Sequence, residues 1–122
     1  MLSAIEGFGQ TSSLEITVLV DNRADLLVKS TETVRRFTEA PLLAEHGFAA
    51  LVELAGDPPA GGRRILWDGG MTSTALLYNA ERMEIDLSTV DAIALSHGHG
   101  DHTAAISDVL RAIDVQPEPR RW

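Results

Sequence analysis

Three of the four histidines in the chain fall within six residues, between positions 97 and 102. His97 and His99 lie two residues apart, so on an extended backbone their side chains point the same way and could hold one metal ion. Asp101 and His102 follow directly and would face a neighbouring position, and Asp101 could also cap a helix that begins there. Four side chains of metal-ligand type in six positions, interleaved with glycines, predict a metal site rather than a solvated histidine-rich loop.

Two predicted elements frame this segment and would place it between a strand and a helix. Residues 91–96 suit a short strand with Ile93 and Leu95 on one face. Residues 104–113 suit a helix, because apolar residues recur there at the i, i+3, i+4 and i+7 spacing of a face turned to the core. Glycines at the junction allow a sharp backbone, so the side chains of 97–102 could converge on one ligand.

The rest of the chain predicts a mixed α/β domain. Residues 14–20 alternate between apolar and polar side chains, which is typical of a strand with one buried face. A long connection with a short helical turn or two is expected over 23–47, where Pro41 interrupts any continuous helix. The remaining predicted elements are a buried strand at 48–55, a returning hairpin strand at 64–67 and a helix at 73–83 capped by Thr72 or Ser73.

Composition excludes several classes of function. The 122 residues carry 18 acidic and 10 basic side chains, a net charge of −8, which argues against a protein that coats nucleic acid. The absence of cysteine excludes disulfides, thiolate metal sites and cysteine nucleophiles. No apolar run approaches the roughly 20 residues that span a bilayer, and the first residues lack a secretory pattern, so we expect a cytoplasmic protein that does not bind membranes. No serine nucleophile elbow and no phosphate-binding P-loop is present.

The spacing His-x-His-x-Asp-His resembles the signature of the metallo-β-lactamase superfamily of metal-dependent hydrolases. Residues 66–70, Leu-Trp-Asp-Gly-Gly, are similar to its earlier motif at the end of a hairpin strand, with Gly69 where that motif often has threonine. Five short segments resemble the branch described as dihydropterin–ribofuranosylaminobenzene-phosphate synthase-like, and the whole resemblance covers 14–113. These segments are 20–22, 44–48, 79–80, 85–88 and 91–92.

The resemblance implies the N-terminal half of a four-layer αβ/βα sandwich with metal ions at one edge. It implies that His97 and His99 bind one ion and that Asp101 and His102 bind a second. Asp101 is also expected to be the catalytic residue. The expected metals are two zinc ions, with manganese or iron as alternatives. Asp68 would orient the loop and the ligands from just outside the ligand set, although a plain turn carboxylate is the other reading.

Three more residues belong to the branch-level resemblance. His46 lies in the long connection and would reach a small-molecule substrate; by residue type alone it could equally be a surface or capping histidine. Asp21 and Asn22 would line the same site, whereas their residue types also favour an ordinary turn.

The resemblance also implies further ligands, because members of the superfamily supply additional histidines and a bridging aspartate from later segments. No histidine follows His102 here. We therefore expect a flexible lead at 1–13, a partial domain at 14–115 and an irregular tail at 116–122. Such a chain would bind metal weakly, be inactive alone, and form a homo-oligomer or pair with a complementing second-half chain.

The predicted function is a metal-dependent hydrolase of a small molecule, such as a phosphate-containing or pterin-related compound. One alternative is a non-catalytic metal-binding remnant or association module. The other is a synthase-like enzyme of methanopterin-type cofactor biosynthesis.

Overall fold

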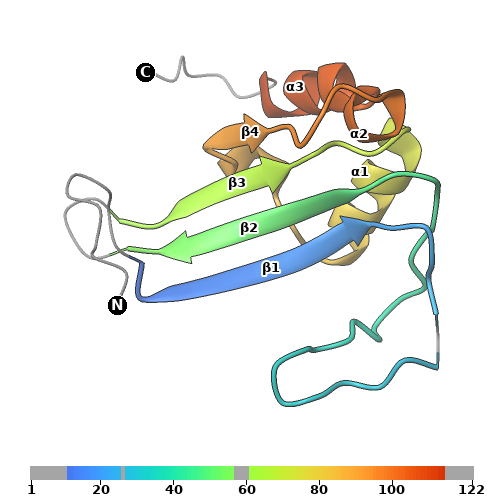
Figure 1. Cartoon of the computed structure of the whole chain (residues 1–122), viewed down its shortest axis with the longest axis vertical. Helices are drawn as coiled ribbons and strands as arrows, with labels where there is room; N and C mark the ends of the chain where they lie inside the picture. Colours follow the sequence, from blue (N-terminus) through green and yellow to red (C-terminus); the bar gives the residue numbers. More distant parts are fainter. Residues whose placement is uncertain (1–10, 26, 57–60, 115–122) are drawn as a thin grey trace.

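A four-stranded mixed sheet forms the frame of the molecule (Figure 1). The computed structural model describes residues 11–25, 27–56 and 61–114. The strands lie in the order of the sequence, the first three antiparallel and the last parallel to the third. They are β1 (Ser13–Val20), β2 (Ala49–Ala55), β3 (Arg63–Trp67) and β4 (Ala92–Ala94). The four predicted strands are thus confirmed, with β4 shorter than expected.

The helices pack on one face of this sheet (Figure 1). They are α1 (Ser73–Arg82), the 3-10 turn η1 (Leu87–Thr89), α2 (Gly100–Thr103) and α3 (Ile106–Asp114). The hydroxyl of Thr72 accepts the N–H of Ala75 and so caps α1, as the sequence predicts. The prediction of a single helix at 104–113 is wrong in one respect. The chain forms a first helical turn at Gly100–Thr103 before α3 begins.

The core lies between the sheet and the helices. Leu51 of β2 and Leu66 of β3 stand opposite each other in register, and both are fully buried. Leu76 of α1 and Val109 of α3 belong to the same buried cluster. This packing fixes the end of β3, from which the next residues enter the candidate site.

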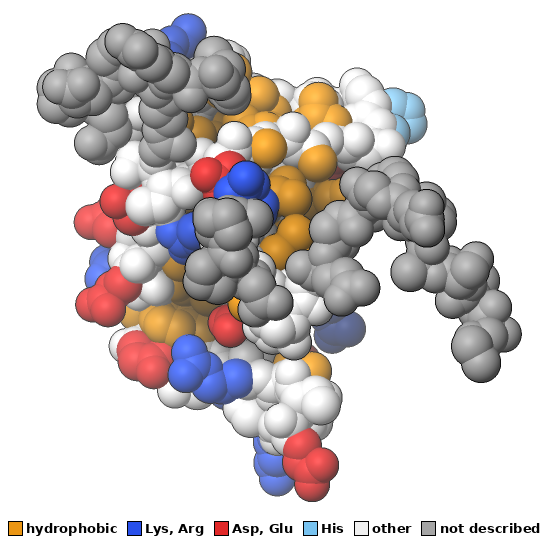
Figure 2. Space-filling model, turned by 90° about the vertical axis from the view of Figure 1, so that its left-hand side faces the viewer, with side chains coloured by type: hydrophobic (Ala, Val, Ile, Leu, Met, Phe, Trp, Pro, Cys, Tyr) orange, Lys and Arg blue, Asp and Glu red, His pale blue; other side chains and the backbone are white. Residues whose placement is uncertain are grey.

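The other face of the sheet is uncovered among the described residues. The sequence predicts a buried face made of Leu14, Ile16, Val18 and Val20. This prediction is wrong for the first three, which are 57%, 57% and 46% exposed, because the helices cover the opposite face. Of these four residues only Val20 is buried, beyond a register shift in β1. From the hairpin end of the sheet, hydrophobic side chains are visible between charged ones (Figure 2).

The connection from β1 to β2 projects away from the sheet and then returns to it (Figure 1). Its described residues contain no helix, so the helical turn expected there is not found. Asn79 of α1 is buried and ties the returning chain to β1. Its Nδ2 donates to the carbonyls of Leu19 (2.7 Å) and Leu43 (2.9 Å), and its Oδ1 accepts the N–H of Leu43 (2.8 Å).

No helix within the described residues is both long and apolar enough to cross a bilayer. The tail expected at 116–122 and most of the lead expected at 1–13 lie outside the described residues.

Candidate metal centre

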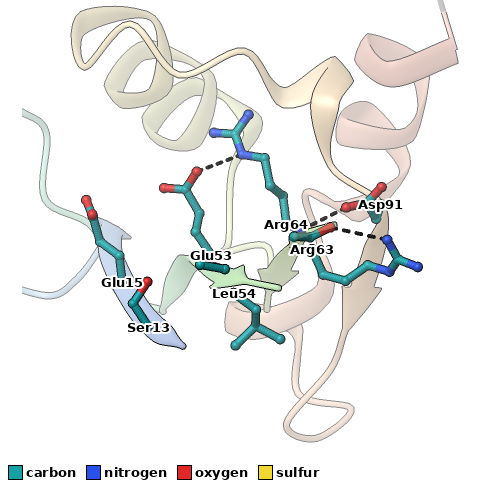
Figure 3. Close-up of a pocket in the computed structure, with 9 residues that line it drawn as sticks. Ser13, Glu15, Glu53, Leu54, Arg63, Arg64 and Asp91 are labelled. Atoms are coloured by element: carbon teal, nitrogen blue, oxygen red, sulfur yellow. Dashed lines mark hydrogen bonds and ion pairs between the residues drawn. The ribbon is translucent and has the colours of Figure 1, made fainter. Parts of the chain in front are cut away.

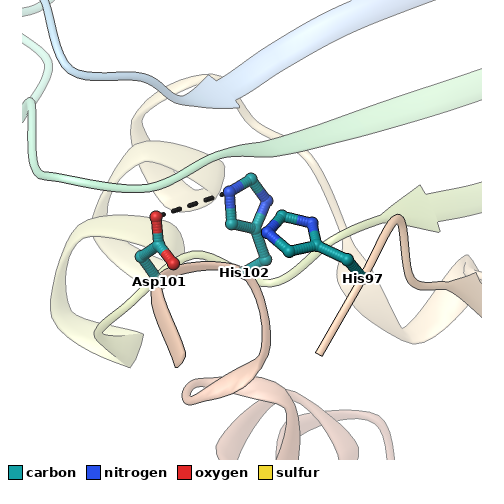
Figure 4. A group of neighbouring side chains, drawn as sticks. All are labelled: His97, Asp101 and His102. Atoms are coloured by element: carbon teal, nitrogen blue, oxygen red, sulfur yellow. Dashed lines mark ion pairs between the residues drawn. The ribbon is translucent and has the colours of Figure 1, made fainter. Parts of the chain in front are cut away.

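Side chains from the segment 97–102 converge just beyond the end of β4, where the chain enters α2 (Figure 4). One ligand atom each from His97, Asp101 and His102 lies within 4.8 Å of the others. His99 is outside this group, although its ring centroid is 4.7 Å from that of His97. The structure therefore assembles three of the four predicted ligand residues around one position.

The start of α2 differs from one expectation. Asp101 was a candidate helix cap, but His99 occupies the cap position and Asp101 lies inside the first turn. The N-terminal end of a helix favours an acidic side chain in that turn, because the unpaired N–H groups carry partial positive charge. Asp101 is only 20% exposed and its carboxylate faces the histidines instead of capping the backbone.

Asp68 is the buried polar anchor of the site. It directly follows β3, is 1% exposed, and has a φ of 58°, which turns the chain sharply after the strand. Its Oδ1 accepts the backbone N–H of Ser96 and its Oδ2 accepts the Ser96 hydroxyl, both at 2.7 Å. Oδ2 also lies 2.8 Å from Nδ1 of His102. One carboxylate thus joins the ends of β3 and β4 to the start of α2.

Proton counting assigns the tautomers of two histidines. Because Asp68 is a carboxylate, Nδ1 of His102 must be the donor in their hydrogen bond. The Ser96 hydroxyl has one hydrogen and donates it in a hydrogen bond to Asp68, so its oxygen accepts a hydrogen bond from the Nδ1–H of His97, and the two atoms lie 2.8 Å apart. In the neutral rings, both Nε2 atoms then carry a free lone pair. This is the state in which imidazole binds a metal ion.

The ionisation of Asp68 fits this role. Burial by itself would raise the pKa of Asp68. The hydrogen bonds from the backbone and hydroxyl of Ser96 and from His102 outweigh burial and hold the pKa of Asp68 below its ordinary value. Asp68 therefore stays a hydrogen-bond acceptor at neutral pH.

The donor set around Asp101 fits a bound cation. Oδ2 of Asp101 lies 3.4 Å from Nε2 of His102. With the His102 proton on Nδ1, these two atoms are both acceptors and repel each other unless a proton or a cation lies nearby. A divalent metal ion removes that repulsion, and a ring nitrogen with a carboxylate oxygen is a usual ligand pair for zinc.

The remaining predicted residues gather at one turn beside the centre. Nε2 of His46 lies 3.2 Å from Oδ2 of Asp101. Oδ1 of Asn22 accepts the N–H of Gly47 at 3.1 Å, and the carbonyl of Asp21 accepts the N–H of Glu45 at 3.2 Å. Asn22 and Asp21 thus hold the turn that presents His46. These two hydrogen bonds are made to the backbone of Gly47 and Glu45.

Two contributors escaped the sequence reasoning. Ser96 bridges Asp68 and His97, and its position directly before the histidine segment was an available signal. The carboxylate of Glu45 accepts hydrogen bonds from the backbone N–H of Met71 (3.1 Å) and of Thr72 (2.9 Å). No local pattern in the sequence indicates that second contact, because it joins residues 27 positions apart.

One surface pocket lies away from the histidine cluster. A pocket of about 470 Å³ opens at the other end of the sheet and shares no residue with the histidine cluster (Figure 3). Within it, Nε of Arg64 pairs with Oε1 of Glu53 at 2.9 Å, and the backbone N–H of Arg64 donates to Oδ2 of Asp91 at 2.8 Å. Arg64 is therefore engaged in structural contacts.

Comparison with known proteins gives three findings. Residues 44–120 match the family model of the Metallo-beta-lactamase superfamily. A protein of Methanocaldococcus jannaschii named 7,8-dihydropterin-6-methyl-4-(beta-D-ribofuranosyl)-aminobenzene-5'-phosphate synthase is 29% identical over 77 residues, which cover 63% of this chain and 26% of that protein. An uncharacterized protein of the same organism is 35% identical over 95 residues, which cover 78% of this chain and 29% of that protein. The chain thus matches between a quarter and a third of the length of these two relatives.

Proposed function

Since the chain belongs to the metallo-beta-lactamase superfamily, we propose that it binds a divalent metal ion through His97, Asp101 and His102 and serves metal-dependent hydrolysis of a small molecule. The observation that carries the proposal is the convergence of these three ligand atoms within 4.8 Å. The hydrogen bonds that link Asp68 to His102 directly, and to His97 through Ser96, support the proposal. They leave the Nε2 atoms of His97 and His102 free to bind a metal ion.

The ligand chemistry indicates which ions would bind. Catalytic zinc sites usually have three protein ligands, and two imidazoles with one carboxylate form such a set. Manganese and iron also accept this donor set. His99 is proposed as a ligand of a second ion, on the strength of the motif and of its position beside His97. When bound, the metal would polarise a substrate oxygen and lower the pKa of water.

The residues of the chain would position and protect this chemistry. Asp68 fixes the orientation of His102 directly and that of His97 through the Ser96 hydroxyl. Asp101 is proposed as a ligand and as the catalytic carboxylate, because it stays 20% exposed and accessible to water beside the two rings. His46 is proposed to line the substrate side of the centre, together with Asp21 and Asn22 at its turn.

A second candidate function has one observation in its favour. The relative that is 29% identical over 77 residues is named as a synthase for a dihydropterin-containing aminobenzene phosphate. A synthase-like activity on a phosphate-containing or pterin-related substrate is therefore the alternative enzyme function. A non-catalytic metal-binding module is the third.

Metal loading followed by turnover separates these functions. The protein is stripped with a chelator, reloaded with zinc or manganese, and assayed on bis(4-nitrophenyl) phosphate. The ligand count in the sequence predicts weak binding and no activity of the chain alone, whereas three converging ligand atoms reach the number that is usual for a catalytic zinc site. On that basis we expect bound metal and metal-dependent hydrolysis, both lost in His97→Ala and both retained in the control Asp108→Asn, whose carboxylate pairs with Arg111 on the surface. Absence of metal uptake would refute the proposal. Metal uptake without hydrolysis would favour the synthase-like or the non-catalytic alternative.

A further inference from the structure

His46 approaches the candidate metal centre from a distant part of the chain. Its Nε2 lies 3.2 Å from Oδ2 of Asp101, although its side chain is 73% exposed. An exposed side chain normally samples several rotamers, so a defined contact needs a fixed backbone beneath it.

The backbone on both sides of His46 is anchored. The carboxylate of Glu45 accepts hydrogen bonds from the backbone of Met71 and Thr72, just before α1, and the N–H of Gly47 donates to the side chain of Asn22. His46 is therefore presented from a short turn with restrained neighbours. This lowers the entropy cost of holding its ring beside Asp101.

The same turn also packs against the backbone of Asp101. The N–H of Phe48 donates to the Asp101 carbonyl at 3.4 Å. Gly47 has a φ of 134°, and a Cβ at that position would lie 2.2 Å from the same carbonyl oxygen. The turn thus contacts Asp101 at its main chain and at its side chain.

Proton counting gives His46 a different role from His102. The Nδ1–H of His102 donates in a hydrogen bond to Asp68, so in the neutral ring Nε2 carries no hydrogen and cannot donate to Asp101. His46 makes no comparable Nδ1 contact among those described, and it can donate from Nε2 both as the charged ring and as the neutral tautomer that carries its proton on Nε2. Of the two imidazoles beside Oδ2 of Asp101, His46 is the one able to orient the carboxylate by an N–H contact.

We infer that His46 is a positioning residue for Asp101: its Nε2 holds the carboxylate in the orientation that lets it act as a metal ligand. This rests on the proposed function, because it assumes that Asp101 binds metal. His46 lies outside the group of three ligand atoms, which supports a role through Asp101 and not as a ligand. Residues that orient a ligand typically contribute about 10- to 100-fold to metal affinity, and the exposure of His46 places it near the lower end.

The test measures zinc affinity by competition with a chromogenic chelator. We expect about tenfold weaker binding in His46→Ala and recovery in His46→Gln, whose amide places an N–H near the original Nε2. Lys29→Ala, an exposed residue of the same connection, serves as the matched control and should bind as the wild type does. Thermal unfolding of the metal-free variants checks that all of them fold alike.

Cobalt distinguishes positioning from direct ligation. At saturating Co²⁺, the visible spectrum reports the number and geometry of the ligands. We expect the spectrum of His46→Ala to match that of the wild type once saturated. A changed spectrum, or a His46→Gln variant as weak as His46→Ala, would overturn the inference.

Two outcomes of these measurements separate the inference about His46 from the proposed metal binding. Wild-type protein that binds neither zinc nor cobalt would refute the proposed function and this inference with it. Wild-type binding with an unchanged affinity in His46→Ala would overturn the inference alone.

Discussion

Asp68 and His102 are hydrogen-bonded through Oδ2 and Nδ1 at 2.8 Å, although 34 positions separate them in the sequence. The bond joins the end of β3 to the first turn of α2 and makes one buried carboxylate part of both the fold and the site. Stability and metal affinity are therefore expected to change together when it is removed.

Replacement of Asp68 by asparagine should destabilise the protein by about 2–4 kcal/mol. An amide keeps one acceptor oxygen, so at least one of the donors from Ser96 and His102 loses its partner in a buried environment. Urea unfolding measures the free energy. Asp108→Asn removes a surface pair with Arg111 and should change stability by less than about 0.5 kcal/mol. Equal effects of the two variants would contradict the role of Asp68.

The acid side of the stability profile should report the same carboxylate. The pKa of Asp68 is lower in the folded protein than its ordinary value of 3.8, so its contribution to stability is present above about pH 4 and is lost as the pH falls through the folded pKa. We expect the free energy of unfolding to fall as the pH drops below about 4, and to fall less steeply in Asp68→Asn. Urea unfolding of metal-free protein at several pH values makes the comparison; parallel profiles would argue against it.

Two glycines near the site should respond differently to alanine. Gly47→Ala combines a φ of 134° with a Cβ position 2.2 Å from a backbone oxygen, and should cost more than about 2 kcal/mol. Gly98→Ala meets no described atom within 4 Å, so its effect on the metal-free protein should stay below about 1 kcal/mol. Thermal unfolding ranks the two variants, and the reverse order would contradict the close approach of Gly47 to the carbonyl of Asp101.

Truncation of a side chain to alanine should lower the free energy of unfolding more on the covered face of the sheet than on the uncovered face. Leu51→Ala empties a fully buried position and should cost about 2–5 kcal/mol. Ile16→Ala, on the face where that residue is 57% exposed, should cost about 1 kcal/mol or less. Similar losses at both positions would show that the face carrying Ile16 is covered in solution.

The uncovered face also bears on association. Ile16 and Val18 leave apolar surface in water, and contact with a second copy would bury part of it. We expect the sedimentation coefficient to rise with protein concentration, and Ile16→Lys to weaken that rise. A concentration-independent monomer in the wild type would contradict self-association through this face.

Local patterns in the sequence predict the elements well where packing and pattern agree. Apolar alternation located β1, and the capping hydroxyl of Thr72 located the start of α1, because both signals depend on near neighbours. Alternation could not tell which side of β1 is buried. That depends on where α1 and α3 pack, which is decided by contacts distant in sequence.

The candidate site shows the same division. The histidine segment was visible because its ligands are adjacent, and the resemblance pointed to Asp68. The contact of His46 with Asp101 and the anchoring of Glu45 at Thr72 arise from the path of the long connection, which no local pattern specifies. The role of Ser96 follows from counting the hydrogen bonds that its hydroxyl can donate and accept. That count depends on the distances from Ser96 to Asp68 and His97, which the sequence does not contain.

Calorimetric titration with zinc is the most direct test of the central claim that His97, Asp101 and His102 bind a divalent metal ion. Chelator-treated wild-type protein should give a saturable binding isotherm. The isotherm should be lost or weakened at least about tenfold in His97→Ala and in His102→Ala, and should persist in Asp108→Asn. Circular dichroism confirms that each variant is folded. A flat titration of folded wild-type protein, or unchanged binding in both histidine variants, would contradict the account.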